Sequence, residues 1–203
     1  IEKNRRERGA KLVVIDPRFT QAAEEADLFL PIAPGQDSAL FSGLLAHLDA
    51  TGSLDLCYAE NYTEGLPEAL TAARRLAPDI AATAALTGLD VKDVARFFDL
   101  FRTTENVVTC FSQGVNQSAQ GTDKVNAILN CHLATGRNGK KGQGPFSLTG
   151  QPNAMGGREV GGLANQLAAH MTFDDPAAID RVRRFWNAPR MATAAGPKAV
   201  DMF

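Results

Sequence analysis

The sequence lacks the cysteine patterns that bind metals and the long apolar runs that cross membranes. Its three cysteines, Cys57, Cys110 and Cys131, are widely separated and include neither a C-x-x-C pair nor a Cys/His cluster at zinc-site spacing. We therefore expect them to be small, buried hydrophobic side chains in a protein of a reducing compartment. No apolar run reaches the roughly 18 residues of a membrane-spanning helix, so no membrane span is expected.

The sequence also has little excess charge and none of the common phosphate-binding motifs. A formal net charge of -2 does not provide the basic surface that nucleic acids require, so we expect no nucleic-acid partner. Neither G-x-G-x-x-G nor G-x-x-x-x-G-K-[ST] occurs, which argues against an ordinary dinucleotide or P-loop site. The 203 residues are nevertheless enough to bury a sizeable core.

Glycine is present but unevenly distributed. Nine of the 18 glycines fall between residues 136 and 162. Because glycine disfavours helices and no alternating strand pattern is present, we predict that the Gly-rich stretch 136–157 has no regular structure. A helix is predicted to follow over residues 158–171.

Elsewhere, apolar runs alternate with amphipathic stretches, which predicts an α/β fold with a mostly parallel sheet flanked by helices. The predicted strands are 11–15, 27–32 and 106–112, and the predicted helices include one starting at Asp37, one capped by Asp90 and one over 118–135. His132 lies on the apolar face of the last of these helices, where a hydrogen-bonded core or interface histidine is expected rather than a metal ligand. The charged run 2–8 resembles the end of a helix that leads into the first strand. We therefore expect the chain to begin inside a larger protein.

Polar residues follow each of the three predicted strands. They are Asp16-Pro17-Arg18, then Pro34-Gly35-Gln36-Asp37, then Gln113-Gly114-Val115-Asn116-Gln117. Ligands of open α/β sheets bind beyond the carboxyl ends of the strands. The carboxylate of Asp16 could accept from ribose hydroxyls or a guanine N–H edge, and Asp37 is predicted to be a helix N-cap. Each segment alone could be a structural turn, whereas all three at one edge indicate a nucleotide-like ligand.

A further candidate lies in the Gly-rich stretch. Gly156 and Gly157 precede Arg158, and a guanidinium can bind two oxygens of an oxyanion at once. The alternative is that Arg158 pairs with Glu159 or with another surface carboxylate, and spacing alone slightly favours that alternative.

Several of these segments together resemble a known family. The segments 14–20, 26–27, 30–40 and 113–118 resemble the molybdopterin oxidoreductase superfamily. The segments 130–136 and 144–162 look more specifically like the catalytic subunit of assimilatory nitrate reductases, in the branch that also contains periplasmic nitrate reductases and formate dehydrogenases. The resemblance extends from about residue 9 to residue 171.

The resemblance implies a Rossmann-like cofactor-binding domain over residues 1–171, with 172–203 as a partly helical or loosely ordered extension. The residues that would bind the guanosine end of one molybdopterin guanine dinucleotide are Asp16, Pro17, Arg18, Phe19, Thr20, Gly35, Gln36 and Asp37. Those that would lie beside the pterin or the metal are Gln113, Gly114 and Gln117, although family members often have Met at the position of Gln113. Gln151 and Arg158 would face the substrate funnel, with Arg158 guiding nitrate.

The resemblance also implies parts that these residues do not contain. The 203 residues lack the cysteine motif of the family's N-terminal [4Fe-4S] cluster and the residue that binds molybdenum. They also lack the C-terminal domain, which binds the rest of both dinucleotides. We therefore expect the 203 residues alone to be inactive and to contain little or no molybdenum.

The intact enzyme would be a cytoplasmic nitrate reductase with a bis-molybdopterin guanine dinucleotide. Its electron donor could be a ferredoxin, a flavodoxin or an NADH-linked subunit. A formate dehydrogenase-like fragment and a stand-alone nucleotide-binding domain without activity remain alternatives.

Overall fold

The computed structural model of the chain describes residue 5 and residues 7–150, 153–162 and 165–197. The chain divides into two compact units, Ile1–Leu148 and Thr149–Phe203. This division by contacts falls between Leu148 and Thr149. The predicted extent of the cofactor-binding domain, residues 1–171, stays a prediction.

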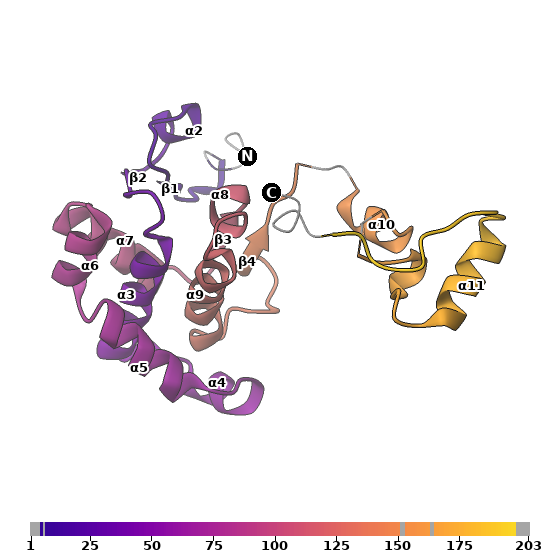
Figure 1. Cartoon of the computed structure of the whole chain (residues 1–203). Helices are drawn as coiled ribbons and strands as arrows, with labels where there is room; N and C mark the ends of the chain where they lie inside the picture. Colours follow the sequence, from indigo (N-terminus) through magenta and orange to yellow (C-terminus); the bar gives the residue numbers. More distant parts are fainter. Residues whose placement is uncertain (1–4, 6, 151–152, 163–164, 198–203) are drawn as a thin grey trace. The chain divides into compact units, whose positions relative to one another are not determined.

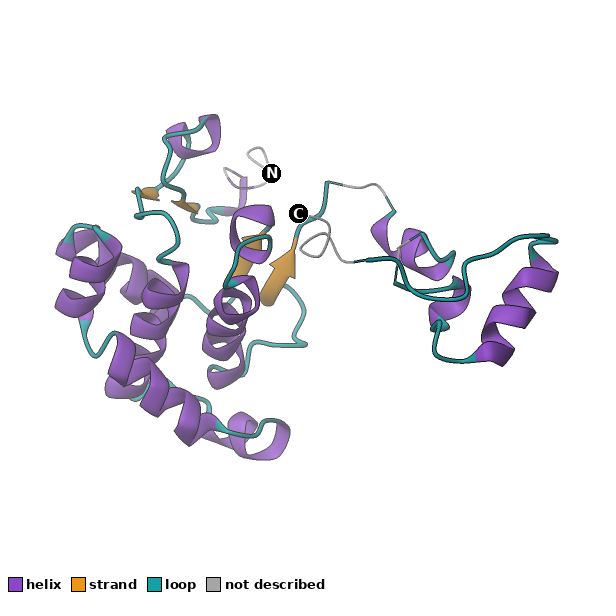
Figure 2. Cartoon of the chain, viewed as in Figure 1, coloured by secondary structure: helices purple, strands orange, loops and turns teal. Residues whose placement is uncertain are grey.

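The first unit combines many helices with four short strands among its described residues (Figure 2). The strands are β1 (Val13–Ile15), β2 (Leu28–Leu30), β3 (Val108–Phe111) and β4 (Gly144–Ser147). The strands β1 and β2 pair in parallel, and so do β3 and β4. The α/β class and the parallel pairing are confirmed, but the described strands form two separate two-stranded sheets instead of one.

The helices of the first unit connect and cover these strands. They are α2 (Gln21–Glu24), α3 (Asp37–Ala50), α4 (Leu56–Tyr62), α5 (Leu66–Leu76), α6 (Ile80–Thr87), α7 (Val91–Thr103), α8 (Gln113–Asn116) and α9 (Gly121–Ala134). The Asp90 side chain accepts a 2.7 Å hydrogen bond from the Lys92 N–H and caps α7, as predicted. The predicted helix 118–135 is confirmed as α9, and Gly136 follows it with a φ of +62°.

The core of the first unit is organised around α3, which packs against α5, α6, α7 and α9 (Figure 1). Its Leu40, Leu44 and Leu48 are fully buried. A side chain at Gly43 would collide with the buried Thr83 of α6, so this glycine allows the two helices to approach closely. No helix in the described part of the chain is long and apolar enough to cross a membrane.

The second unit contains α10 (Ala154–Glu159), a short 3-10 helix η1 (Ala168–His170) and α11 (Pro176–Phe185) around a small core of its own. The amphipathic piece predicted near Ile179 is confirmed as α11. The helix predicted over 158–171 is wrong, because α10 ends at Glu159 and Gly161 has a φ of +75°. The Gly-rich stretch is also more regular than predicted, since it contains β4 and most of α10.

Candidate functional site

The carboxyl end of β1 carries a tight polar turn. The Asp16 N–H donates to the Leu30 carbonyl at 3.2 Å, so pairing with β2 continues one residue beyond the strand. One carboxylate oxygen of Asp16 accepts from the Arg18 N–H at 2.7 Å and also lies 3.8 Å from the Arg18 guanidinium. An aspartate that bonds the backbone two residues ahead stabilises such a turn. The turn therefore holds Asp16 at the strand end and leaves Arg18 and Pro17 exposed.

An exposed aromatic ring follows this turn. Phe19 is 67% exposed, and its ring packs edge-on against Phe29 of β2 with centroids 5.2 Å apart. Thr20 is the N-cap position of α2, without a side-chain hydrogen bond to the helix. The predicted segment Asp16–Thr20 thus lies along the end of β1 and packs on β2.

The segment after β2 differs from the prediction in one respect. Gly35 has a φ of +88° with open space around it, and α3 begins two residues later. Asp37 is not the N-cap: that position is Gln36, which makes no side-chain cap bond. A carboxylate oxygen of Asp37 instead lies 2.8 Å from the ammonium nitrogen of Lys124. The Lys124 side chain is only 5% exposed, and a buried ammonium requires a charged or strongly polar partner.

The segment after β3 is the one-turn helix α8 rather than a loop. Gln113, Gly114 and Gln117 are exposed on it or directly after it. A side chain at Gly121 would collide with the Asn116 carbonyl, so this glycine lets α8 lie directly against the start of α9. Close backbone contact at a glycine fixes the position of the three exposed residues.

Each of the three polar segments is held by a contact of its own. Asp16 bonds to β2, Asp37 bonds to Lys124 in the second turn of α9, and Asn116 packs on Gly121 at the start of the same helix. These residues come from segments up to about 100 positions apart in the sequence. The first unit therefore holds the second and third polar segments at the beginning of α9, and the first at the end of β1 beside β2.

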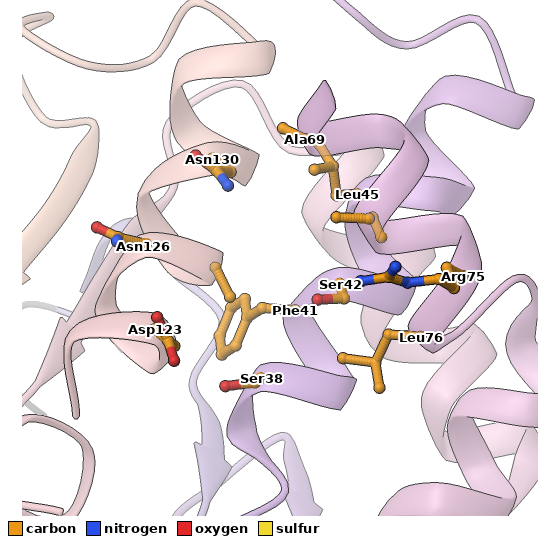
Figure 3. A pocket seen from close by; sticks show the side chains of 13 residues that line it. Ser38, Phe41, Ser42, Leu45, Ala69, Arg75, Leu76, Asp123, Asn126 and Asn130 are labelled. Atoms are coloured by element: carbon orange, nitrogen blue, oxygen red, sulfur yellow. The ribbon is translucent and has the colours of Figure 1, made fainter. Parts of the chain in front are cut away.

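A cavity of about 390 Å³ opens beside this region, between α3, α5 and α9 (Figure 3). Its polar lining from α9 is Asp123, Asn126 and Asn130, and Ser38 and Phe41 of α3 line the same cavity. The hydroxyl oxygen of Ser38 is buried with no hydrogen-bond partner among the described residues. The sequence did not predict this cavity, although the spacing of the three α9 residues places them on one helical face.

His132 is a core histidine, as predicted. It is fully buried, and its Nε2 lies 2.7 Å from the Thr109 hydroxyl of β3. Burial, together with the nearby charge of Arg137, lowers the pKa of His132 to about 4. Arg137 itself donates to the carbonyls of Phe101 and Thr104 at 2.8 and 2.6 Å, and its guanidinium lies 4.6 Å from the centroid of the Phe101 ring. The buried position of Arg137 was not predictable from the sequence, because no neighbouring residue distinguishes it from a surface arginine.

The cysteines agree with the prediction only in part. Cys131 is buried, with its thiol 3.2 Å from the Phe41 carbonyl, whereas Cys57 and Cys110 are exposed. The prediction is wrong for these two because it treated all three as core residues. The described residues contain no group of three or more His, Cys, Asp or Glu side chains that could hold a metal ion.

The second unit carries Arg158, in the last turn of α10. The Asn153 side chain caps this helix by accepting from the Gly156 N–H at 2.9 Å. Arg158 is exposed, and its backbone carbonyl accepts from the Gln166 side chain at 2.7 Å. Among the described residues, its guanidinium forms no ion pair with Glu159 or any other carboxylate. Gln151, the other predicted substrate-facing residue, lies outside the described residues.

Comparison with known proteins gives one family and a consistent set of relatives. The family model described as molybdopterin oxidoreductase matches residues 1–199. The nitrate reductase of Shewanella frigidimarina is 47% identical over 194 residues, covering 96% of this chain and 21% of that protein. The assimilatory nitrate reductase of Haloferax mediterranei is 35% identical over 194 residues, with coverages of 95% and 26%.

More distant relatives have other named activities. The F420-dependent formate dehydrogenase subunit alpha of Methanocaldococcus jannaschii is 29% identical over 170 residues, covering 84% of this chain and 25% of that protein. Among solved structures, acetylene hydratase from Pelobacter acetylenicus has a TM-score of 0.58 and 27% identity, covering 64% of this chain and 18% of that one. The chain thus spans about a quarter or less of the length of each of these relatives.

Proposed function

Because the chain belongs to the molybdopterin oxidoreductase family, we propose that it is the part of a nitrate reductase that binds the guanosine end of a molybdopterin guanine dinucleotide. The observation that carries this proposal is the 47% identity to a nitrate reductase over nearly the whole chain, against 29% to a formate dehydrogenase. We call the longer protein to which these residues would belong the intact protein.

The chemistry of the residues at the strand ends fits the guanosine end. Asp16 and Asp37 supply carboxylate oxygens, which can accept from ribose hydroxyls and from the N–H groups of guanine. Gly35 supplies exposed backbone that a ligand can approach closely. Pro17, Arg18, Phe19, Thr20 and Gln36 complete the predicted set of contacts. In this proposal Lys124 acts by orienting the Asp37 carboxylate.

The molybdenum carried by the cofactor would supply the two-electron chemistry that converts nitrate to nitrite. The chain's own residues would bind and orient. Gln113, Gly114 and Gln117 would lie beside the pterin or the metal, where exposed amides offer both donors and acceptors. Arg158 would bind the nitrate anion through its guanidinium, whose fork contacts two oxygens at once, and Gln151 would donate a further hydrogen bond.

The rest of the proposal concerns the intact protein. It would carry a [4Fe-4S] cluster and a bis-molybdopterin guanine dinucleotide. It would accept electrons from a ferredoxin, a flavodoxin or an NADH-linked subunit, and it would act in the cytoplasm. These features follow from the likeness to assimilatory nitrate reductases, of which the Haloferax mediterranei protein is one by name.

The test is an assay of the purified intact protein with an artificial viologen donor or acceptor. We expect nitrite to form from nitrate when reduced viologen is supplied, and no reduction of oxidised viologen by formate. Formate oxidation without nitrate reduction would instead assign the chain to the formate dehydrogenases, and nucleotide binding without either activity would indicate a non-enzymatic domain.

A further inference from the structure

The segment that contains α11 concentrates positive charge in a chain that is otherwise slightly acidic. Residues 176–197 contain four arginines and one acidic residue, Asp180, which gives this segment a net charge of +3, against -2 for the whole chain. Asp180 lies 3.0 Å from the Arg183 guanidinium and also pairs with Arg184. Arg190 is exposed and forms no ion pair with another described residue. The positive charge of this segment is therefore only partly neutralised within the second unit.

Two aromatic side chains are exposed beside these arginines. Phe185, the last residue of α11, is 85% exposed, and Trp186, its C-cap, is 44% exposed. The side of α11 that packs into the second unit is formed by Ala178 and Val182, so neither ring belongs to that small core. Aromatic residues and arginine are the side chains enriched in protein interfaces and in their energetically dominant positions. The composition of this surface is therefore typical of a docking site for another protein.

A cavity of about 540 Å³ adjoins the same arginines. It is lined by Arg183 and Arg190, and apolar walls come from Phe173, Ile179 and Met191. A guanidinium binds two oxygens of a carboxylate at once. The cavity therefore fits an apolar side chain whose neighbours on the partner are acidic.

We propose that the α11 surface, formed by Arg183, Phe185, Trp186 and Arg190, docks a small acidic electron-carrier protein. Opposite charges on two surfaces speed their encounter and fix their relative orientation. The inference rests on the proposed function, because a redox enzyme needs an electron donor. Among the donors named above, it selects the small acidic carriers, ferredoxin and flavodoxin, over an NADH-linked subunit.

A transient partner fits this surface better than a permanent one. Permanent interfaces bury a large and mainly apolar area, whereas here two aromatic side chains stand among charged ones. A lipid surface fits less well, because a helix that lies in a membrane needs a broad apolar face. The apolar side of α11 instead packs with Leu167 in the core of the second unit. Small charged surfaces are characteristic of weak electron-transfer complexes, which form and separate quickly.

The test is titration calorimetry of the intact protein with a purified ferredoxin and, separately, with a purified flavodoxin. We expect at least one carrier to bind, with a Kd that rises at least about 10-fold in Arg190→Glu and in Phe185→Ala. Lys92→Glu, the same change of charge at an exposed position of α7, is the matched control and should change the Kd by less than about twofold. Binding of neither carrier, or equal effects at Arg190 and Lys92, would overturn the proposal.

Two further readouts identify a different occupant. Substitution of exposed side chains should move the midpoint of thermal unfolding by no more than about 2 °C. A much larger fall in Phe185→Ala, with carrier binding unchanged, would show that the rest of the intact protein covers this surface and would contradict the proposal. Sedimentation of the intact protein with phosphatidylglycerol vesicles, lost in Arg190→Glu while carrier binding is unchanged, would contradict it in favour of a membrane.

The assay with viologen separates this proposal from the proposed function, because viologen is a small molecule that needs no docking surface. A protein that binds a carrier through Arg190 but reduces no nitrate would contradict the proposed function alone. A protein that reduces nitrate with viologen but binds neither carrier would contradict the docking proposal alone.

Discussion

The ammonium nitrogen of Lys124 lies 2.8 Å from a carboxylate oxygen of Asp37, and this pair joins the start of α3 to the second turn of α9. The side chains are 5% and 18% exposed. The pair fixes one of the three polar segments that follow the predicted strands. It therefore links the stability of the first unit to the geometry of the proposed cofactor site.

Replacing Lys124 by methionine is expected to destabilise the intact protein by about 3 kcal/mol, because a largely buried carboxylate loses its charged partner. The change is measured as a lower midpoint of unfolding. Lys92→Met, at an exposed position of α7, is the control and should change the stability by less than about 0.5 kcal/mol. Equal losses of stability in the two variants would mean that the ion pair between Asp37 and Lys124 does not stabilise the protein.

Asp37→Asn in the intact protein is expected to lower the molybdenum content to less than about half, because an amide cannot accept both guanine N–H groups as a carboxylate does. Elemental analysis measures the effect. Asp123→Asn, next to Lys124 on α9 but exposed, is the matched control and should leave the content unchanged. A normal molybdenum content in the Asp37 variant would remove this residue from the proposed site.

Arg158→Ala is expected to lower kcat/KM for nitrate by about 100-fold, corresponding to roughly 2.7 kcal/mol of lost stabilisation, while molybdenum is retained. Arg158→Lys should recover part of the loss, since it restores the charge without the planar fork. Arg181→Ala, at an exposed position of α11, serves as the control. Unchanged nitrate kinetics after loss of Arg158 would exclude its role in anion binding.

Acidification is expected to destabilise the first unit through His132. Burial lowers its pKa from about 6.5 to about 4, so between these values the unfolded chain takes up a proton that the folded chain excludes. Stability is therefore retained above pH 6.5 and lost as the pH falls towards 4, by up to about 1.4 kcal/mol for each pH unit. His47, whose pKa burial also lowers, contributes in the same direction.

Unfolding measured between pH 7 and pH 4.5 tests this expectation. His132→Gln, which keeps a polar atom for Thr109, should flatten the pH dependence, whereas His170→Gln at an exposed position should preserve it. If the stability of the His132→Gln variant depended on pH as strongly as that of the wild type, another group would be responsible.

Local sequence signals predicted the elements that depend on local interactions. The cap at Asp90, the end of α9 before Gly136 and the amphipathic α11 follow from neighbouring residues alone. The apolar runs likewise located β1, β2 and β3. The position of Asp16 after a strand and the glycines before Arg158 indicated a nucleotide-like ligand and an oxyanion, and the family resemblance supplied the more specific roles, which are predictions.

Features that depend on distant partners were not predictable in this way. The strand β4 forms because it pairs with β3, more than 30 residues earlier, despite a glycine-rich composition. The position of the Asp37 carboxylate is set by Lys124, which no spacing rule connects to it. Arg137 is buried against carbonyls of Phe101 and Thr104, a site that exists only after α7 and α9 have packed.

The most direct test of the central claim is a crystal structure of the intact protein isolated with its cofactor. The account predicts the guanine base of one dinucleotide hydrogen-bonded to the Asp37 carboxylate at about 3 Å, beside the Asp16 turn at the end of β1. A guanine base bound elsewhere, with Asp37 bonded only to Lys124, would contradict it.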